Sequence, residues 1–236
     1  NFNYENPKVF DAINDIAKMI KQIDPNHPTT TPLAGFDKRA LKELEARAPD
    51  LDFVSFQVYA SVFAIPQYIQ DVNFEKPFFV TEWGSVGHWE VAKTEWGAPI
   101  ENTSTEKAQN YYKSYFDVLQ PHADKAIGNY VFLWGQKQEK TPTWYGMFLS
   151  SGEETEAVDV MHYIWNGKWP DNRAPTISPI RLNNKTAFDN VKLDKGQTVS
   201  GSVQVIDLEQ DPIEYQWVVK KESTSTNVGG DKEYVP

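Results

Sequence analysis

The sequence predicts an α/β fold: the C-terminal half of a (β/α)8 TIM barrel, followed by a small and incomplete all-β sandwich. Two observations lead to this fold class. Short apolar runs alternate four times with segments of helical periodicity, which is the rhythm of βα units around a parallel sheet. After residue 170 this rhythm stops, and short stretches alternate apolar and polar residues with period two. The predicted domains are residues 1–170 and 174–236.

Cap and turn signals place the elements of the first domain. Asn6 followed by Pro7 is typical of a helix start, and apolar residues recur at helical spacing up to Ile23. Thr103 and Glu106 form the capping-box pattern of a later helix. In chain order, we expect helix 7–23, strand 29–33, helix 37–48, strand 51–59, helix 66–71, strand 77–82, a long loop 84–102, helix 103–119, strand 126–134 and helix 154–165.

Four βα units make only half of a (β/α)8 barrel, which typically needs about 250 residues. A four-stranded parallel sheet cut from a barrel would expose two unpaired edges. We therefore expect further strands upstream, or the rest of the barrel from another polypeptide.

The second domain begins after a polar, proline-containing linker over 171–175. Its predicted strands are 191–193, 198–206 and 213–219. A sandwich usually has about 100 residues, so this domain is expected to be partial. Asp207 and Asp211 resemble a calcium-binding loop only loosely, and a solvated turn is favoured.

Composition and charge exclude several functions. The net charge of −10 argues against nucleic acid or an anionic membrane surface as the partner. The chain has no cysteine, which excludes disulfides, thiolate metal sites and cysteine nucleophiles. It also contains no run of about 18 apolar residues that could span a bilayer. The His, Asp and Glu residues show no metal-ligand spacing, so neither a metal nor a cofactor is predicted.

The strongest functional signal is the segment Lys76–Gly84, an apolar run that ends on Glu82, Trp83 and a glycine. Barrel enzymes carry out chemistry at the carboxyl ends of such strands. Glu82 is therefore a candidate nucleophile or general base, the alternative being a surface acid. Trp83 offers a flat face on which a sugar ring could stack. Thr94–Gly97 repeats the same four letters without a preceding apolar run, so we expect Glu95 in the loop, without a catalytic role.

Other candidates follow from their positions at strand ends. Tyr59 ends the strand before Glu82, and its hydroxyl could donate to the carboxylate and keep it ionised. Trp134 ends the next strand and could form the floor of a sugar subsite. Both could instead be packing residues at the rim of the barrel. Weaker candidates for substrate contact are Gln57, Gln136 and His88.

The chain also carries five characteristic segments: Ile23–Pro28, Val54–Tyr59, Thr81–Gly84, Phe132–Gly135 and Thr143–Gly146. They resemble the C-terminal half of the catalytic barrel of glycoside hydrolase family 2, within the broad clan of retaining (β/α)8 glycosidases. The resemblance covers roughly residues 4–170. The tail from Ala174 is similar to the Ig-like or cadherin-like modules that are appended to exported bacterial glycosidases.

The resemblance implies roles for three residues. Glu82 matches the nucleophile at the end of barrel strand seven, Tyr59 the strand-six tyrosine that bonds it, and Trp134 the strand-eight tryptophan beneath the sugar. The acid/base of that clan is a glutamate after an asparagine, which would fall just before the first residue here. Glu5 does not follow an asparagine and is not assigned this role. Retaining hydrolysis needs two carboxyl groups, so the chain alone is expected to be inactive.

The predicted function is thus a retaining glycoside hydrolase that acts on a polysaccharide or oligosaccharide without a cofactor. It is expected to be secreted or periplasmic, with the N-terminal half of the barrel as its missing partner. Two alternatives stay open. A transglycosylase would use the same site with an acceptor sugar in place of water. A non-catalytic carbohydrate-binding or scaffold protein would be consistent with the missing acid.

Overall fold

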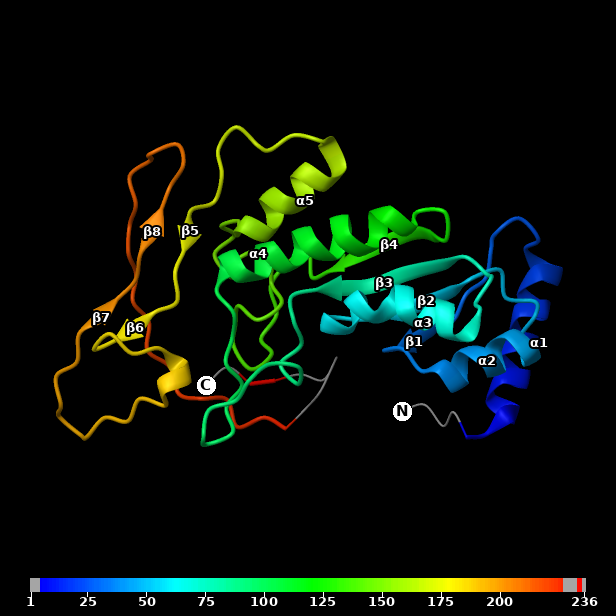
Figure 1. Ribbon diagram of the computed structural model, residues 1–236, viewed down its shortest axis with the longest axis horizontal. Coiled ribbons are helices and arrows are strands. Elements are labelled where there is room, and N and C mark those ends of the chain that lie inside the picture. The colour runs from blue at the N-terminus through cyan, green and yellow to red at the C-terminus, as the bar shows by residue number, and fades with distance from the viewer. Residues whose placement is uncertain (1–4, 227–232, 235–236) are drawn as a thin grey trace. The chain divides into compact units, whose positions relative to one another are not determined.

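The computed structural model of the chain describes residues 5–226 and 233–234. Figure 1 shows its elements, coloured along the chain. The helices are α1 (Pro7–Ile23), α2 (Lys38–Arg47), α3 (Ile65–Val72), α4 (Ser104–Lys113) and α5 (Glu156–Asn166). Shorter helical turns are η1 (Ala60–Ala64), η2 (Ser114–Leu119), η3 (Gln120–His122) and η4 (Ala187–Asp189). The strands are β1 (Pro32–Ala34), β2 (Val54–Gln57), β3 (Phe78–Gly84), β4 (Ala126–Phe132), β5 (Thr176–Ile177), β6 (Arg181–Leu182), β7 (Gly201–Ser202) and β8 (Val205–Ile206).

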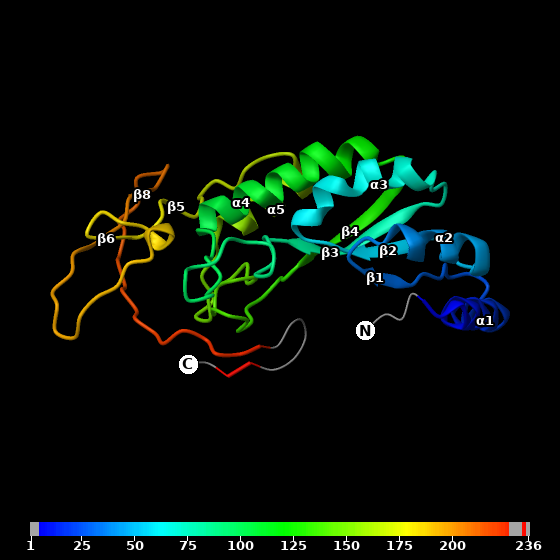
Figure 2. The same cartoon turned by 60° about the horizontal axis from the view of Figure 1, so that its bottom comes forward.

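The strands β1 to β4 form one sheet in the order in which they occur along the chain. β1 pairs with β2, and β2 with β3, in parallel. Helical segments connect each strand to the next, as Figure 2 shows from a second direction. This arrangement confirms the predicted α/β class and the parallel sheet. Consecutive parallel strands joined by helices are the building units of a (β/α)8 barrel.

The described chain forms two compact units: Asn1–Trp83 with Ser114–Val131, and Gly84–Lys113 with Phe132–Pro236. The predicted domain boundary near residue 170 is a different division and stays a prediction. Among the buried side chains of the first unit are Phe10, Leu33, Leu41, Leu44, Val54, Phe56, Ile65, Phe78 and Val80. Those of the second include Tyr111, Trp144, Tyr145, Met147, Val160 and Met161. No helix of the described residues combines the length and the hydropathy that crossing a membrane requires.

Helix α1 forms as predicted, but it does not bury the apolar stripe that its sequence suggests. Its Asn6 cap accepts a hydrogen bond from the Lys8 amide at 3.1 Å. The residues that it buries are Phe10, Asn14 and Ala17. The exposed large apolar side chains of the helix are Val9, Ile16, Met19, Ile20 and Ile23. Helical spacing therefore identified the helix but not the face that is buried.

In the second unit, α4 and α5 pack side by side (Figure 1). The predicted capping box at the start of α4 is present, because the Thr103 amide donates to Glu106 Oε2 at 2.8 Å and the Glu106 amide donates to Thr103 Oγ1 at 3.1 Å. The predicted helix continues beyond Lys113, but as a π-helical segment, η2, rather than as α-helix.

Two acids of α5, Glu156 and Asp159, contact α4 and the start of the C-terminal segment, which begins near residue 174. Burial raises the pKa of Glu156, although Thr105 Oγ1 donates a hydrogen bond to its carboxylate. Burial also raises the pKa of Asp159, whose Oδ2 accepts from the Ala174 amide at 2.8 Å. The Ile177 amide donates to Thr105 Oγ1 at 2.7 Å. These bonds connect the start of the C-terminal segment to both helices.

Replacing Glu156 with glutamine is expected to change how the free energy of unfolding depends on pH. The folded pKa of Glu156 is raised, so its contribution to stability is present below an unfolded pKa of about 4.3 and is lost as the pH rises through the folded pKa. Between about pH 4 and pH 7, wild type should therefore lose stability relative to the variant. Urea unfolding of both proteins at the two pH values measures the difference. Parallel pH profiles would contradict the assignment.

The strands of the C-terminal segment are shorter than its alternating pattern predicts and lie partly at other positions. β5 pairs with β8 and β6 with β7, in both cases antiparallel over two residues. Residues 191–193 and 213–219, predicted as strands, are not strands in the described structure. The alternating aromatic residues of the second stretch, Tyr215 and Trp217, are exposed, because no partner strand covers them. The amide of Asp211 donates to Asp207 Oδ1 at 2.8 Å, which makes this acidic stretch a turn.

Candidate functional site

Glu82 and Tyr59 come together at the carboxyl ends of β3 and β2. Tyr59 Oη donates to Glu82 Oε1 at 2.5 Å, and the Tyr59 side chain is buried. The Val58 amide donates to the backbone carbonyl of Glu82 at 2.8 Å, which ties the two strand ends together. The carboxylate is thus held at the sheet edge where barrel enzymes place reacting groups.

A β-bulge sets the direction of this carboxylate. Phe56 pairs with Val80, but the next residue of β2, Gln57, pairs with Glu82, so Thr81 has no partner on β2. The Thr81 hydroxyl donates to the Phe56 carbonyl at 3.4 Å. Because side chains alternate along a strand, one extra residue re-aims the residues that follow it. The bulge therefore places Glu82 beside Gln57, one of the weaker candidates.

Trp83 does not offer a face to a sugar, and this part of the prediction is wrong. Its side chain is fully buried, and its Nε1 donates to Asn129 Oδ1 on β4 at 3.1 Å. The residue follows Glu82 directly, so the strand alternation turns its ring into the packed interior. Trp83 is a structural residue of the sheet.

Gly84, two residues after Glu82, is required by close packing. A Cβ at this position would lie 2.3 Å from the Phe132 carbonyl oxygen and 2.7 Å from Tyr111 Oη. Asn110 Nδ2 donates to the Gly84 carbonyl at 2.7 Å, and Tyr111 Oη donates to the Phe132 carbonyl at 3.0 Å. Burial raises the pKa of Tyr111, so the hydroxyl stays protonated and can donate.

Residues 136–143, which follow β4, form a closed loop that we call the β4 loop. Gln136 Nε2 donates to the Pro142 carbonyl at 2.8 Å. Lys140 lies at the tip with a φ of 62°, in the left-handed region. Backbone hydrogen bonds of 3.0 and 2.7 Å join the residues on either side of it. Gln136, a candidate for substrate contact, is thus engaged in shaping this loop.

His88 also supports the β4 loop rather than lying open to a substrate. It is buried, with Nε2 3.2 Å from Glu139 Oε1, and its ring is nearly perpendicular to that of Trp144. Lys137 Nζ lies 2.5 Å from the other carboxylate oxygen of Glu139. Burial lowers the pKa of His88 despite the nearby carboxylate, so the ring is neutral at pH 7. The prediction of substrate contact is therefore not supported for this residue.

Trp134 is exposed, as expected for a residue that a substrate could reach. Its side chain is 54% exposed. Its ring centroid lies 5.0 Å from that of Phe148 and 5.7 Å from that of Trp165, which is itself 58% exposed. The sequence analysis did not predict this pair. No pattern links the two residues, because their contact is tertiary.

The two copies of Thr-Glu-Trp-Gly lie in different environments, as predicted. Glu95 lies in the loop after β3, where its amide donates to Asn190 Oδ1 at 2.7 Å and its carboxylate pairs with Lys192. Both contacts are on the exposed surface. Glu95 thus has no neighbour comparable to Tyr59 and serves as an internal control for Glu82.

Solved structures with a similar fold are glycoside hydrolases. A family 2 β-galacturonidase from Eisenbergiella tayi, solved with galacturonate, aligns with a TM-score of 0.51 and 15% identity over 71% of this chain and 32% of its own. A thermostable family 51 α-L-arabinofuranosidase from Thermotoga petrophila aligns with a TM-score of 0.49 and 13% identity over 68% of this chain and 36% of its own. The chain therefore spans about a third of each.

No family model matches the sequence, and neither does any curated protein. The structural likeness and the parallel sheet together define the class: the fold is that of part of a (β/α)8 barrel of the kind found in glycoside hydrolases.

Proposed function

We propose that the chain is the nucleophile-bearing part of a retaining glycoside hydrolase, with Glu82 as the nucleophile. The observation that carries the proposal is the hydrogen bond of 2.5 Å from Tyr59 Oη to Glu82 Oε1 at the carboxyl ends of neighbouring barrel strands. A buried phenol that donates to one carboxylate oxygen orients the group and leaves the other oxygen for attack.

The proposed reaction has two steps. A carboxylate oxygen of Glu82 bonds to the anomeric carbon of the sugar while the bond from that carbon to the leaving oxygen breaks, which gives a glycosyl ester. Water then cleaves the ester and restores the carboxylate. A second carboxyl group, about 5–5.5 Å from the first, protonates the leaving oxygen and later deprotonates the water. We propose that this acid/base lies outside the 236 residues, in the N-terminal half of the barrel.

The finer assignments belong to the same proposal. Five sequence segments support membership of glycoside hydrolase family 2, and the two short antiparallel pairs β5–β8 and β6–β7 are compatible with part of an Ig-like module. The substrate is a polysaccharide or oligosaccharide, and the protein is exported. Trp134, which is exposed two residues after the end of β4, is the candidate for stacking against a sugar ring.

The first test labels the nucleophile without relying on an acid/base. A 2,4-dinitrophenyl 2-deoxy-2-fluoroglycoside releases its phenolate without protonation, and the fluorine slows hydrolysis of the ester. We expect one dinitrophenolate released per chain, and peptide mass spectrometry should place the sugar on Glu82. Glu82→Gln should abolish labelling, while Glu95→Gln, in the identical tetrapeptide, should label like wild type. Labelling that survives Glu82→Gln would overturn the proposal.

Tyr59→Phe tests the hydrogen bond itself. The variant keeps the ring and removes only the donor to Glu82, so the fold should be unaffected. A hydrogen bond to a charged group contributes about 1.5–3 kcal/mol, so we expect the labelling rate to fall by roughly 10- to 100-fold. Tyr68→Phe, on α3, is the control and should label at the wild-type rate. An unchanged rate for Tyr59→Phe would show that this bond does not assist the attack.

A further inference from the structure

The β4 loop already binds a carboxylate from the same chain. The Lys140 amide donates to both carboxylate oxygens of Glu233, at 3.1 Å each, and the Ser223 hydroxyl donates to Oε1. Glu233 is 9% exposed. Burial opposes its ionisation, but the bonds from Ser223 and Lys140 outweigh burial and hold the pKa of Glu233 below its usual value. The tip of this loop is therefore built to stabilise an anion.

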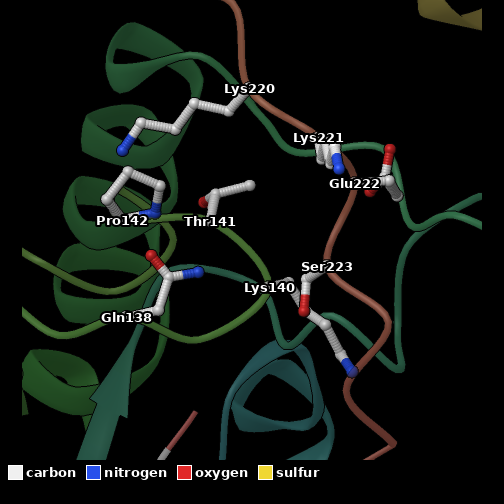
Figure 3. Close-up of a pocket in the computed structure, with 8 residues that line it drawn as sticks. All are labelled: Gln138, Lys140, Thr141, Pro142, Lys220, Lys221, Glu222 and Ser223. Carbon is white, nitrogen blue, oxygen red and sulfur yellow. The ribbon is translucent and has the colours of Figure 1, made fainter. Parts of the chain in front are cut away.

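Beside this carboxylate lies a cavity of about 180 Å³. Residues of the β4 loop form one wall, and residues 220–223 form the other (Figure 3). The lining residues are Gln138, Lys140, Thr141, Pro142, Lys220, Lys221, Glu222 and Ser223. This volume lies below the roughly 300–1,000 Å³ of pockets for drug-sized ligands, so a single sugar unit or its charged group suits it better than a large cofactor.

The residues that line the cavity carry a net positive charge, whereas the whole chain is negatively charged. Three lysines and one glutamate line the cavity, whereas the chain carries a net charge of −10. Lys140 Nζ is engaged by the Ser225 carbonyl. Lys220 and Lys221 are exposed, and neither forms an ion pair within residues 5–226 and 233–234. Two ammonium groups are thus available to an anion in the cavity.

We propose that this cavity is a subsite for an acidic sugar, in which Lys220 and Lys221 bind its carboxylate. The inference rests on the proposed hydrolase, since it names the substrate class of that enzyme as anionic saccharides. The β4 loop follows the carboxyl end of a barrel strand, which is the side where barrel enzymes bind substrates. Ammonium groups bind carboxylates through short charge-assisted hydrogen bonds.

The test measures binding to the whole chain by isothermal titration calorimetry. The probes are a uronic-acid trisaccharide and its carboxyl-reduced neutral counterpart. We expect the acidic probe to bind more tightly, with a preference that weakens as salt rises, because exposed charges are screened. The double variant Lys220→Gln/Lys221→Gln should lose about tenfold or more of the affinity for the acidic probe and none for the neutral one. Lys195→Gln, an exposed lysine elsewhere, is the matched control.

Four results would overturn the inference. The first two are equal affinity for the two probes and binding of neither probe. The other two are wild-type affinity in the double variant and sulfate alone binding as tightly as the acidic trisaccharide. The last would make this a site for free anions. Because the readout is binding, the two proposals fail separately. Labelling of Glu82 without a preference for the acidic probe rejects only this subsite, and the preference without labelling rejects only the hydrolase.

Discussion

Replacing Lys107 with methionine is expected to lower the free energy of unfolding by about 1–3 kcal/mol, because it removes the cation that pairs with the partly buried carboxylate of Glu101. Lys107 Nζ pairs with Glu101 and donates to the Thr143 carbonyl at 2.6 Å. Burial lowers the pKa of Lys107, although Glu101 acts against this shift. The methionine would fill the space of the side chain but donate no hydrogen bond, so Glu101 Oε1 would keep only the bond of 2.9 Å from Thr143 Oγ1 and the Thr143 carbonyl would lose its bond from Lys107. Urea unfolding followed by circular dichroism measures the loss.

Lys113→Met, an exposed position on the same helix, is the control and should change stability by less than about 0.5 kcal/mol. The double variant Lys107→Met/Glu101→Gln separates the two contributions. If the unpaired carboxylate causes the loss, the double variant should recover part of it. A single variant as stable as wild type would mean that the bond from Thr143 Oγ1 and water satisfy Glu101 without Lys107.

Replacing Gly84 with alanine should lower the free energy of unfolding by about 1–3 kcal/mol. The nearest atom to the added Cβ would be a backbone oxygen, that of Phe132, at 2.3 Å. A flexible side chain could rotate away, but this carbonyl belongs to the last residue of β4 and also accepts from Tyr111 Oη. Relief therefore requires the strand ends to separate, which we expect to slow labelling of Glu82 as well.

Gly201→Ala is the matched control, because the nearest atoms to its Cβ would be those of the Trp217 and Leu182 side chains at 3.5–3.8 Å, an ordinary contact distance. Its midpoint of urea unfolding should stay within experimental error of wild type. If Gly84→Ala also unfolds like wild type, the close approach of β3 and β4 is not rigid.

Strands and helices with strong local signals could be predicted from the sequence. The apolar run before Glu82 corresponds to β3, and the pair formed by Thr103 and Glu106 marks the start of α4 within one residue. The contact between Tyr59 and Glu82 was also predictable, because the ends of neighbouring parallel strands meet at one edge. These features depend on residues that are close in sequence or on a general rule of sheet geometry.

The errors concern burial, which depends on partners far away in the sequence. Trp83 is buried and bonded to Asn129, and His88 is buried next to Glu139. No sequence pattern near Trp83 or His88 indicates these distant partners. The alternation around Trp217 is typical of a strand, yet a strand forms only where another one supplies hydrogen bonds. Periodicity indicates which side chains could share a face, but it does not tell what covers that face.

The bulge at Thr81 has a consequence for how such a chain can evolve. Substitutions at this position alter a contact, but loss of the bulge with Thr81 still present would pair Gln57 with Thr81 and turn Glu82 to the opposite face of the sheet. Selection for the carboxylate therefore acts on the register between β2 and β3 as well as on the identity of their residues. Lineages that keep the chemistry should tolerate exchanges in these strands far better than a change of this register, even after most of the sequence has diverged.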